Sequence, residues 1–212
     1  MNQIPESPTE GLSWQDIKSR IREVSTYLPY FLKNPIEGMK RVPSWDWPTV
    51  LILEILIAAA TSVLAGVVAK HWLSVLSGVI LGPLMGLIIS FILSGVLFYA
   101  CLFVLKTELE FRKIFVVVVL AKVPSQILAI LAPIARPITL VCFILTALLL
   151  VVGLVENFML DRKKVSQIIG TIAGIVVLGW IYVTIMEATS THIKVQDYTP
   201  ESLDQIHKEI DK

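Results

Sequence analysis

Five long apolar segments dominate this chain and restrict the folds that are open to it. Each holds about 20 residues, which is the length that a helix needs to cross the hydrocarbon core of a bilayer. Hydrophobic residues make up 55% of the chain and charged residues 17%, whereas a soluble domain usually carries about 25% charged residues. The sequence therefore predicts an all-α, polytopic membrane protein with five spans, at residues 49–68, 79–105, 114–132, 138–160 and 168–186.

The polar residues divide the chain into three parts. Residues 1–47 form a mostly polar N-terminal region without a secretory signal peptide. Residues 48–187 contain the five predicted spans, and residues 188–212 form a polar tail. The loops between the spans are too short to hold a soluble catalytic domain, so the membrane region is the main structural unit.

The distribution of Lys and Arg predicts the orientation of the spans. The N-terminal region and the loops after the second and fourth spans carry twelve of the seventeen Lys and Arg residues that lie outside the spans, and the other side carries five. Positive residues are enriched in cytoplasmic loops. We therefore expect the N-terminus in the cytoplasm and the C-terminus outside, which an odd number of spans requires.

The N-terminal region contains an amphipathic helix, predicted to be cytoplasmic. Its apolar residues recur at steps of three and four, and basic residues lie off that face. Such a helix is typical of the membrane interface, but it can equally pack on the ends of the spans, and both can hold at once. Together with two tryptophans before the first span, the predicted interface residues are Trp14, Lys18, Arg20, Arg22, Trp45 and Trp47.

Small residues recur every four positions along the second span and again in the fifth. They allow close approach of helix backbones inside a bilayer. We interpret them as packing surfaces within the bundle, with homo-oligomerisation through one ridge as the alternative. These residues are Gly78, Gly82, Gly86, Ser90 and Ser94 in the second span, and Gly170 and Gly174 in the fifth.

Glu54, Lys122 and Glu156 are ionisable residues inside apolar segments. A charge at the bilayer centre costs roughly 2.5–3.5 kcal/mol on insertion scales, so it normally has a partner or lines a cavity. By helical rise, Glu54 lies about 9 Å and Lys122 about 13 Å from the cytoplasmic side. We expect them to pair, with Glu156 as a competing partner for Lys122. A buried ion pair that fixes packing is the favoured interpretation, and an ion or substrate path is the alternative.

Several classes of function find no support in the sequence. It contains none of the motifs HExxH, GxSxG or the P-loop, and no metal-ligand spacing of His and Cys. We therefore predict no catalytic residues, no metal and no cofactor, and classify the chain as not an enzyme. The net charge of +1 gives no reason to expect nucleic acid as a partner. Cys101 and Cys142 lie near opposite faces, so they are not expected to form a disulfide.

Three stretches resemble the Yip (Ypt-interacting protein) domain family. Residues 34–42 are similar to the family's opening cytosolic helix with its proline. Residues 111–124 resemble its aromatic-basic loop followed by a helix with a mid-membrane proline, and Gly153-Leu154 before a basic turn also fits. The similarity covers residues 30–186. It implies five membrane helices, a cytosolic N-terminus and a short external C-terminus.

The resemblance also implies what the protein does and where it resides. Eukaryotic members act in organelle shaping and trafficking through Rab GTPases. This chain lacks their Asp-Leu-Tyr-Gly-Pro motif before the first span and their long N-terminal extension. It therefore looks closer to the short prokaryotic members, which implies a bacterial or archaeal inner membrane.

Two functions follow from these features. The first is a non-enzymatic membrane scaffold, adaptor or membrane-organising factor, with the lipid bilayer and a protein at the cytoplasmic face as partners. The second is a small transporter or channel that uses Glu54, Lys122 and Glu156. Five spans are few for a monomeric transporter, and no inverted repeat is evident.

Overall fold

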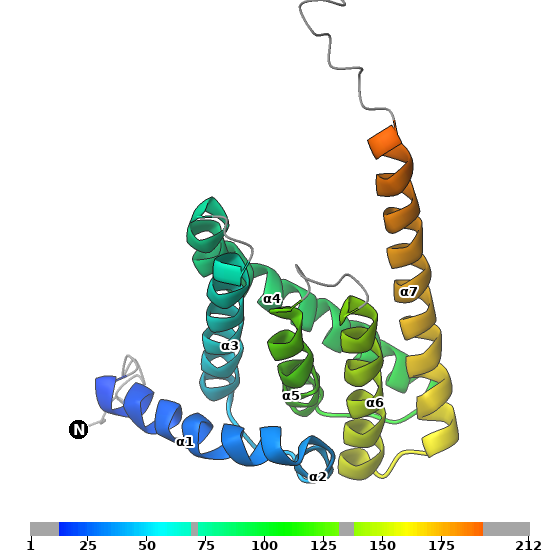
Figure 1. The fold of residues 1–212 in the computed structure, drawn as a ribbon. Helices are drawn as coiled ribbons and strands as arrows, with labels where there is room; N and C mark the ends of the chain where they lie inside the picture. Colours follow the sequence, from blue (N-terminus) through cyan, green and yellow to red (C-terminus); the bar gives the residue numbers. More distant parts are fainter. Residues whose placement is uncertain (1–12, 69–71, 132–137, 193–212) are drawn as a thin grey trace, which may run out of the picture. The chain divides into compact units, whose positions relative to one another are not determined.

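The computed structural model describes residues 13–68, 72–131 and 138–192, and these residues are almost entirely helical. The chain divides into two compact units, Met1–Ala173 and Gly174–Lys212, which we describe separately. Figure 1 shows the helices in chain order. They are α1 (Trp14–Lys33), α2 (Pro35–Lys40), α3 (Trp47–Val68), α4 (Trp72–Ala100), the π-helix η1 (Cys101–Leu105), α5 (Phe111–Ala129), α6 (Ile138–Phe158) and α7 (Arg162–His192).

Helix α1 begins at a capping box. The side chain of Ser13 accepts the Gln15 N–H, and the Asp16 carboxylate accepts the Ser13 N–H at 3.3 Å. These bonds satisfy amide groups that would otherwise lack a partner in the first turn. The start of α1 is therefore encoded locally in the sequence.

Within the described residues, four helices are long and apolar enough to cross a membrane. They are Trp47–Val68, Gly78–Leu105, Ile138–Phe158 and Arg162–Met186. The second of these continues from α4 into η1, whose wider turns end at Lys106 in a left-handed conformation with φ of 52°. The coarse expectation of an all-helical protein with apolar spanning helices is thus met. The predicted third span is not among the four.

Helix α5 differs from α3, α4 and α6, which contain no Lys or Arg, because it carries three basic residues, Arg112, Lys113 and Lys122. It is nevertheless the most buried helix of the first unit. Every residue from Ile114 to Ala121 is buried, and the helix packs against α3, α4, α6 and α2. In Figure 1 it lies between α3 and α6. Side chains from all around α5 therefore contact protein, which is typical of a central helix.

Helices α3 and α4 pack closely along the predicted ridge of small residues. A Cβ added to Gly82 would lie 2.1 Å from Ser62 Oγ, and one added to Gly86 would lie 3.0 Å from Glu54 Oε1. A Cβ at Gly78 would lie 3.2 Å from Ser62 Cβ, and Ser90 and Ser94 are fully buried. Within this chain the ridge therefore packs against α3, and homo-oligomerisation through a ridge of small residues stays a prediction.

Helices α1 and α2 lie across one end of the bundle formed by α3–α6 (Figure 1). We call these two helices the platform. Val24 and Phe31 of α1 and Met39 of α2 are buried in the same core as the bundle residues. The platform is thus packed on the end of the bundle, one of the two alternatives for the amphipathic helix.

Helix α7 extends across the boundary between the two units. Its first turns belong to the first unit, where Val165 and Ile169 are buried in the core. From Gly174 the helix belongs to the second unit and continues to His192. The predicted polar tail lies outside the described residues from position 193 onward, and so do residues 1–12, 69–71 and 132–137.

Candidate functional site

The most unusual feature of the bundle is an ion pair between α3 and α5. Lys122 Nζ lies 2.6 Å from Glu54 Oε1, and the side chain of Glu54 is 0% exposed while that of Lys122 is 13% exposed. The two residues are 68 positions apart in the chain. The structure therefore brings together the two charges that their similar depths led us to pair.

Helix α4 completes the surroundings of the lysine. Lys122 Nζ also donates to Ser90 Oγ at 2.6 Å and to the carbonyl oxygen of Gly86 at 3.1 Å. An ammonium group has three N–H donors, so each has an acceptor. Ser90 Oγ in turn donates to Glu54 Oε1 at 3.1 Å. We call Glu54, Gly86, Ser90 and Lys122 the buried charge site.

Helix α6 supports the lysine from behind through a chain of hydroxyl groups. Thr146 Oγ1 donates to Ser125 Oγ at 2.7 Å, and Ser125 Oγ donates to the carbonyl oxygen of Lys122 at 2.7 Å. Cys142 Sγ also donates to the carbonyl oxygen of Ser125. These contacts attach the polar segment of α5 to α6, so the position of Lys122 is determined by three neighbouring helices.

Three buried polar atoms near this region have no hydrogen-bond partner among the described residues. They are Glu54 Oε2, Ser94 Oγ and Gln126 Oε1. Ser94 lies one turn from Ser90 on α4, and Gln126 lies one turn from Lys122 on α5. Buried polar atoms without a partner cost free energy unless a water or a ligand satisfies them. Unpartnered polar atoms inside the bundle are the feature that an ion or substrate path would need.

Glu156 does not belong to the buried charge site. It is exposed on α6, and no ion pair joins it to Lys122. Its charge instead influences Lys40, whose pKa is raised mainly by the hydrogen bond to Glu37 and further by the negative charge of Glu156. The expected three-residue cluster is therefore wrong, because α6 turns Glu156 away from the bundle and toward the end where α2 lies.

The next residue of α6, Asn157, connects this helix to α2 and α5. Its Nδ2 donates to the carbonyl oxygen of Met39 at 2.7 Å, and its Oδ1 accepts the Val42 N–H at 3.0 Å. Lys113 Nζ donates to its carbonyl oxygen at 3.3 Å. Asn157 was not predicted from the sequence, although an uncharged amide at the end of an apolar segment is the signal that could have identified it.

A second ion pair attaches the platform to the start of α3. Arg20 of α1 pairs with Asp46, and its Nη1 also donates to Thr49 Oγ1 at 3.0 Å. Asp46 Oδ1 accepts the Thr49 N–H at 3.2 Å and so caps the first turn of α3. Burial raises the pKa of Asp46, but the hydrogen bonds from Arg20 and Thr49 outweigh it and leave that pKa below its ordinary value.

Aromatic side chains reinforce the same junction. Trp45 Nε1 donates to Glu23 Oε1 at 2.7 Å, and the rings of Tyr27 and Trp45 meet edge to face. The Tyr27 hydroxyl donates to the carbonyl oxygen of Gly38 at 3.2 Å. Burial, together with the neighbouring Tyr30, raises the pKa of Tyr27 to about 12. The tyrosine therefore remains a neutral hydrogen-bond donor at physiological pH.

The six predicted interface residues separate into two groups. Trp14, Lys18 and Arg22 are exposed on α1. The other three are occupied within the protein: Arg20 pairs with Asp46, Trp45 is buried, and the ring of Trp47 lies 5.3 Å from that of Phe115. Trp45 therefore lies in the protein core, and Trp47 is partly buried against that core.

The two glycines predicted to pack in the fifth span have different outcomes. Gly170 is exposed, and an added Cβ would meet nothing within 4 Å in the described structure. The expected packing at Gly170 is therefore wrong within the first unit. Gly174 begins the second unit, so its packing role stays a prediction.

Metal and disulfide chemistry receive no support from the described residues. Among them, no three His, Cys, Asp or Glu side chains are grouped to hold a metal ion. Cys101 and Cys142 are both free and buried.

Comparisons with known proteins do not place the chain in a family. No family model, no curated protein and no solved structure matches it. The resemblance to the Yip domain family therefore stays a prediction from the sequence, and the function has to be argued from the geometry of this chain alone.

Proposed function

We propose that this protein is a non-enzymatic membrane scaffold. Five membrane-spanning helices, α3 to α7, would hold the two-helix platform at the cytoplasmic surface. The platform would organise the membrane surface and recruit a protein partner there. The proposal includes an N-in, C-out orientation in a bacterial or archaeal inner membrane. These assignments agree with the resemblance to the short prokaryotic members of the Yip domain family.

The helix that brings the number of spans to five in this proposal is α5, which is third in chain order. Its 19 residues correspond to about 28 Å at 1.5 Å per residue, close to the roughly 30 Å of a hydrocarbon core. Arg112 and Lys113 lie in its first turn, where basic side chains can reach an interface. Only Lys122 would lie deep in the bilayer, and its three N–H groups have acceptors. These contacts support a crossing by α5, although it is not among the four described helices that are apolar enough to span a membrane by composition.

The observation that carries the scaffold proposal is the way the platform is attached. Three separate polar junctions hold it to the bundle: Arg20 with Asp46, Glu23 with Trp45, and Asn157 with the backbone of residues 39 and 42. A helix that served only as a flexible N-terminal extension would not need them. A fixed orientation at one end of the bundle is what a docking surface requires.

Photo-crosslinking in cells tests this proposal. A photoreactive amino acid at Thr26 or Tyr30, both exposed or partly exposed on α1, should capture a defined protein partner in the parent. Asn157→Ala should strongly reduce that capture, because it releases the platform from α6, whereas Gln167→Ala on exposed α7 should not. Capture that is unchanged by Asn157→Ala, or no specific partner at either position, would contradict the scaffold proposal.

A transporter or channel is the second candidate function, and the unpartnered Glu54 Oε2, Ser94 Oγ and Gln126 Oε1 favour it. The saturated coordination of Lys122 argues for a structural role instead. Ion flux through liposomes that contain purified protein would distinguish the two. A specific flux that Lys122→Met abolishes in folded protein would replace the scaffold proposal with the transport alternative.

A further inference from the structure

We infer that the N-terminal half of α1 lies on an anionic lipid surface beside the bundle, with its apolar edge in the interface and its basic edge among the headgroups. This inference rests on the proposed function, because it specifies which surface the platform contacts. It is carried by the rotation of α1 about its axis, which contacts in its C-terminal half determine.

The C-terminal half of α1 establishes which side of the helix faces the bundle. Val24 is 3% exposed and Phe31 is 0% exposed, and both belong to the bundle core. Arg20, near the same side, is held by Asp46 and Thr49 at the start of α3. The helix therefore cannot rotate freely, and the direction of every other side chain on it follows from these contacts.

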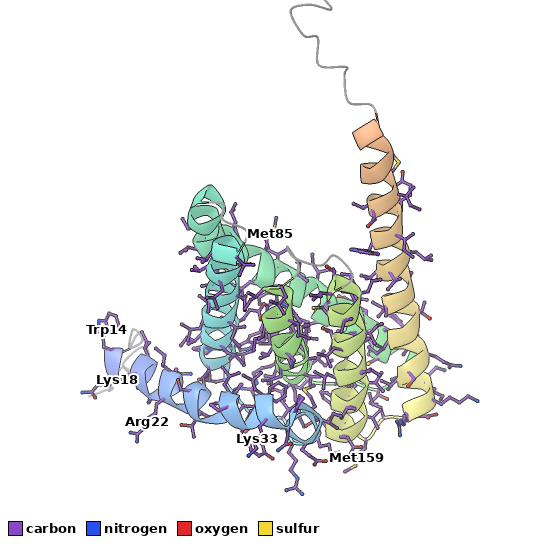
Figure 2. All side chains as sticks on the ribbon, viewed as in Figure 1. Trp14, Lys18, Arg22, Lys33, Met85 and Met159 are labelled. Atoms are coloured by element: carbon purple, nitrogen blue, oxygen red, sulfur yellow. The ribbon has the colours of Figure 1, made fainter. Side chains whose placement is uncertain are left out.

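The N-terminal half continues the same apolar side beyond the bundle. Ile17, Ile21 and Trp14 precede Val24 at helical steps of three and four, so they lie on or next to the bundle-facing side. Ile17 is partly buried, but Ile21 is 39% exposed and Trp14 is 84% exposed, so these two have few protein neighbours. Figure 2 shows Trp14 on the side of α1 toward which the bundle helices extend. That is the side on which lipid would surround a membrane-spanning bundle.

The basic residues of α1 point the other way. Lys18, Arg22 and Lys33 are exposed and extend away from the bundle in Figure 2. The carboxylates of Asp16 and Glu23 remain charged, but they lie on another side of the helix, where they accept the Ser13 N–H and the Trp45 indole N–H. The exposed edge of α1 is therefore positive, and a cationic edge beside a Trp/Ile edge is complementary to anionic headgroups above acyl chains.

Site-specific probes on the full-length protein in nanodiscs test this inference. Cys101→Ser/Cys142→Ser removes the two native thiols, and a single environment-sensitive label is then placed at Trp14→Cys or Gln15→Cys. These neighbours lie about 100° apart on the helix. In discs that contain phosphatidylglycerol, spin-labelled lipids should quench the label at 14 several-fold more strongly than the label at 15.

Charge variants test the anionic preference. Lys18→Gln/Arg22→Gln should reduce quenching at position 14 to the level seen in phosphatidylcholine discs, whereas Lys163→Gln/Lys164→Gln, an equal loss of charge at the start of α7, should not. Equal quenching at 14 and 15 would overturn the inference. It would mean that the apolar edge of α1 contacts water or a protein instead of lipid. Equal quenching at 14 in both lipids would overturn the preference for anionic lipid.

Hydrogen exchange keeps the inference testable if the cysteine-free protein does not fold. In the unaltered chain, amides 14–22 should exchange several-fold more slowly in phosphatidylglycerol discs than in phosphatidylcholine discs, with no change in α5. No difference would overturn the inference. The crosslinking at Thr26 and Tyr30 is a separate readout, so a partner captured there without lipid contact at Trp14 would leave the scaffold proposal intact.

Discussion

Two ion pairs attach other helices to α3 or to the residue just before it, and they differ in their surroundings. Glu54 and Lys122 meet in the core with 0% and 13% of their side chains exposed. Arg20 and Asp46 meet at the end of the bundle with 23% and 44% exposed. The first pair connects α3 to the central helix of the bundle, and the second connects α3 to the platform.

The difference in burial determines what each pair contributes. Removing one member of a buried pair leaves an uncompensated charge and costs about 3–5 kcal/mol, whereas replacing both members can be nearly neutral. An exposed pair contributes only about 0–1 kcal/mol because water and salt screen it. We therefore expect the inner pair to determine whether α5 can remain in the bundle, and the outer pair to adjust how firmly the platform is held.

The largest effect should come from separating the inner pair. Glu54→Gln and Lys122→Met should each lower the free energy of unfolding in detergent by about 3–5 kcal/mol, and the double variant should recover a large part of that loss. Thermal unfolding followed by circular dichroism measures this. Glu37→Gln, which breaks the exposed pair with Lys40, is the matched control. Additive losses in the double variant would mean that the two charges do not stabilise each other.

A smaller effect should follow from crowding the inner pair. Gly86→Ala places a Cβ 3.0 Å from Glu54 Oε1 and 3.3 Å from Ala58 Cβ, and such overpacking costs about 1–3 kcal/mol. Gly95→Ala on the same helix meets nothing within 4 Å, so it should be neutral or slightly stabilising. If both alanine variants unfold at the same temperature in the same detergent, the close contact of α3 and α4 is not what positions Glu54.

Removing the serine that bridges the pair should cost a similar or slightly smaller amount. Ser90→Ala deletes one acceptor of Lys122 and one donor to Glu54, which should cost about 1–3 kcal/mol. Ser94→Ala is the matched control, because Ser94 is equally buried and its hydroxyl has no partner among the described residues. An equal loss in chemical unfolding of the two variants would show that Ser90 acts through its volume and not through its hydrogen bonds.

The outer pair should give the smallest effect and a dependence on pH. Asp46→Asn should change the free energy of unfolding by at most about 1 kcal/mol. Because hydrogen bonds hold the folded-state pKa of Asp46 below its ordinary value, its contribution is present above the unfolded-state pKa of about 3.9 and is lost as pH falls through the folded value. The difference between parent and Asp46→Asn should therefore narrow on acidification below about pH 4. A difference that widens there would contradict the assignment.

The same comparison shows which contacts a sequence can predict. Glu54 and Lys122 are isolated charges in apolar segments. Because burying an unpaired charge is costly, each was expected to have a partner, and their similar depths indicated that they pair with each other. Arg20 and Asp46 lie among other charged residues near the surface, where many pairings are equally favourable. Their contact depends on how α1 crosses the end of the bundle, and the pattern of the sequence does not specify that.

The residues near the ends of apolar segments were the least predictable. Glu156 satisfied the depth criterion, but the rotation of α6 exposes it and directs Asn157 to the platform. Similarly, small residues in α4 face α3, whereas Gly170 of α7 faces no protein atom within 4 Å in the described structure. The pattern of apolar residues identifies a helix and how deep each residue lies in the membrane. Tertiary packing determines which neighbouring helix contacts each side of it.

We propose that the inner ion pair allows α5 to cross the membrane as the third of five spans. Topology reporters fused at Arg162 and at Lys212 test this most directly. If α5 crosses, Arg162 lies in the cytoplasm and Lys212 lies outside. If the chain crosses only through the four helices that hydropathy identifies, both signals are reversed, with Arg162 outside and Lys212 in the cytoplasm, and that result would contradict the account.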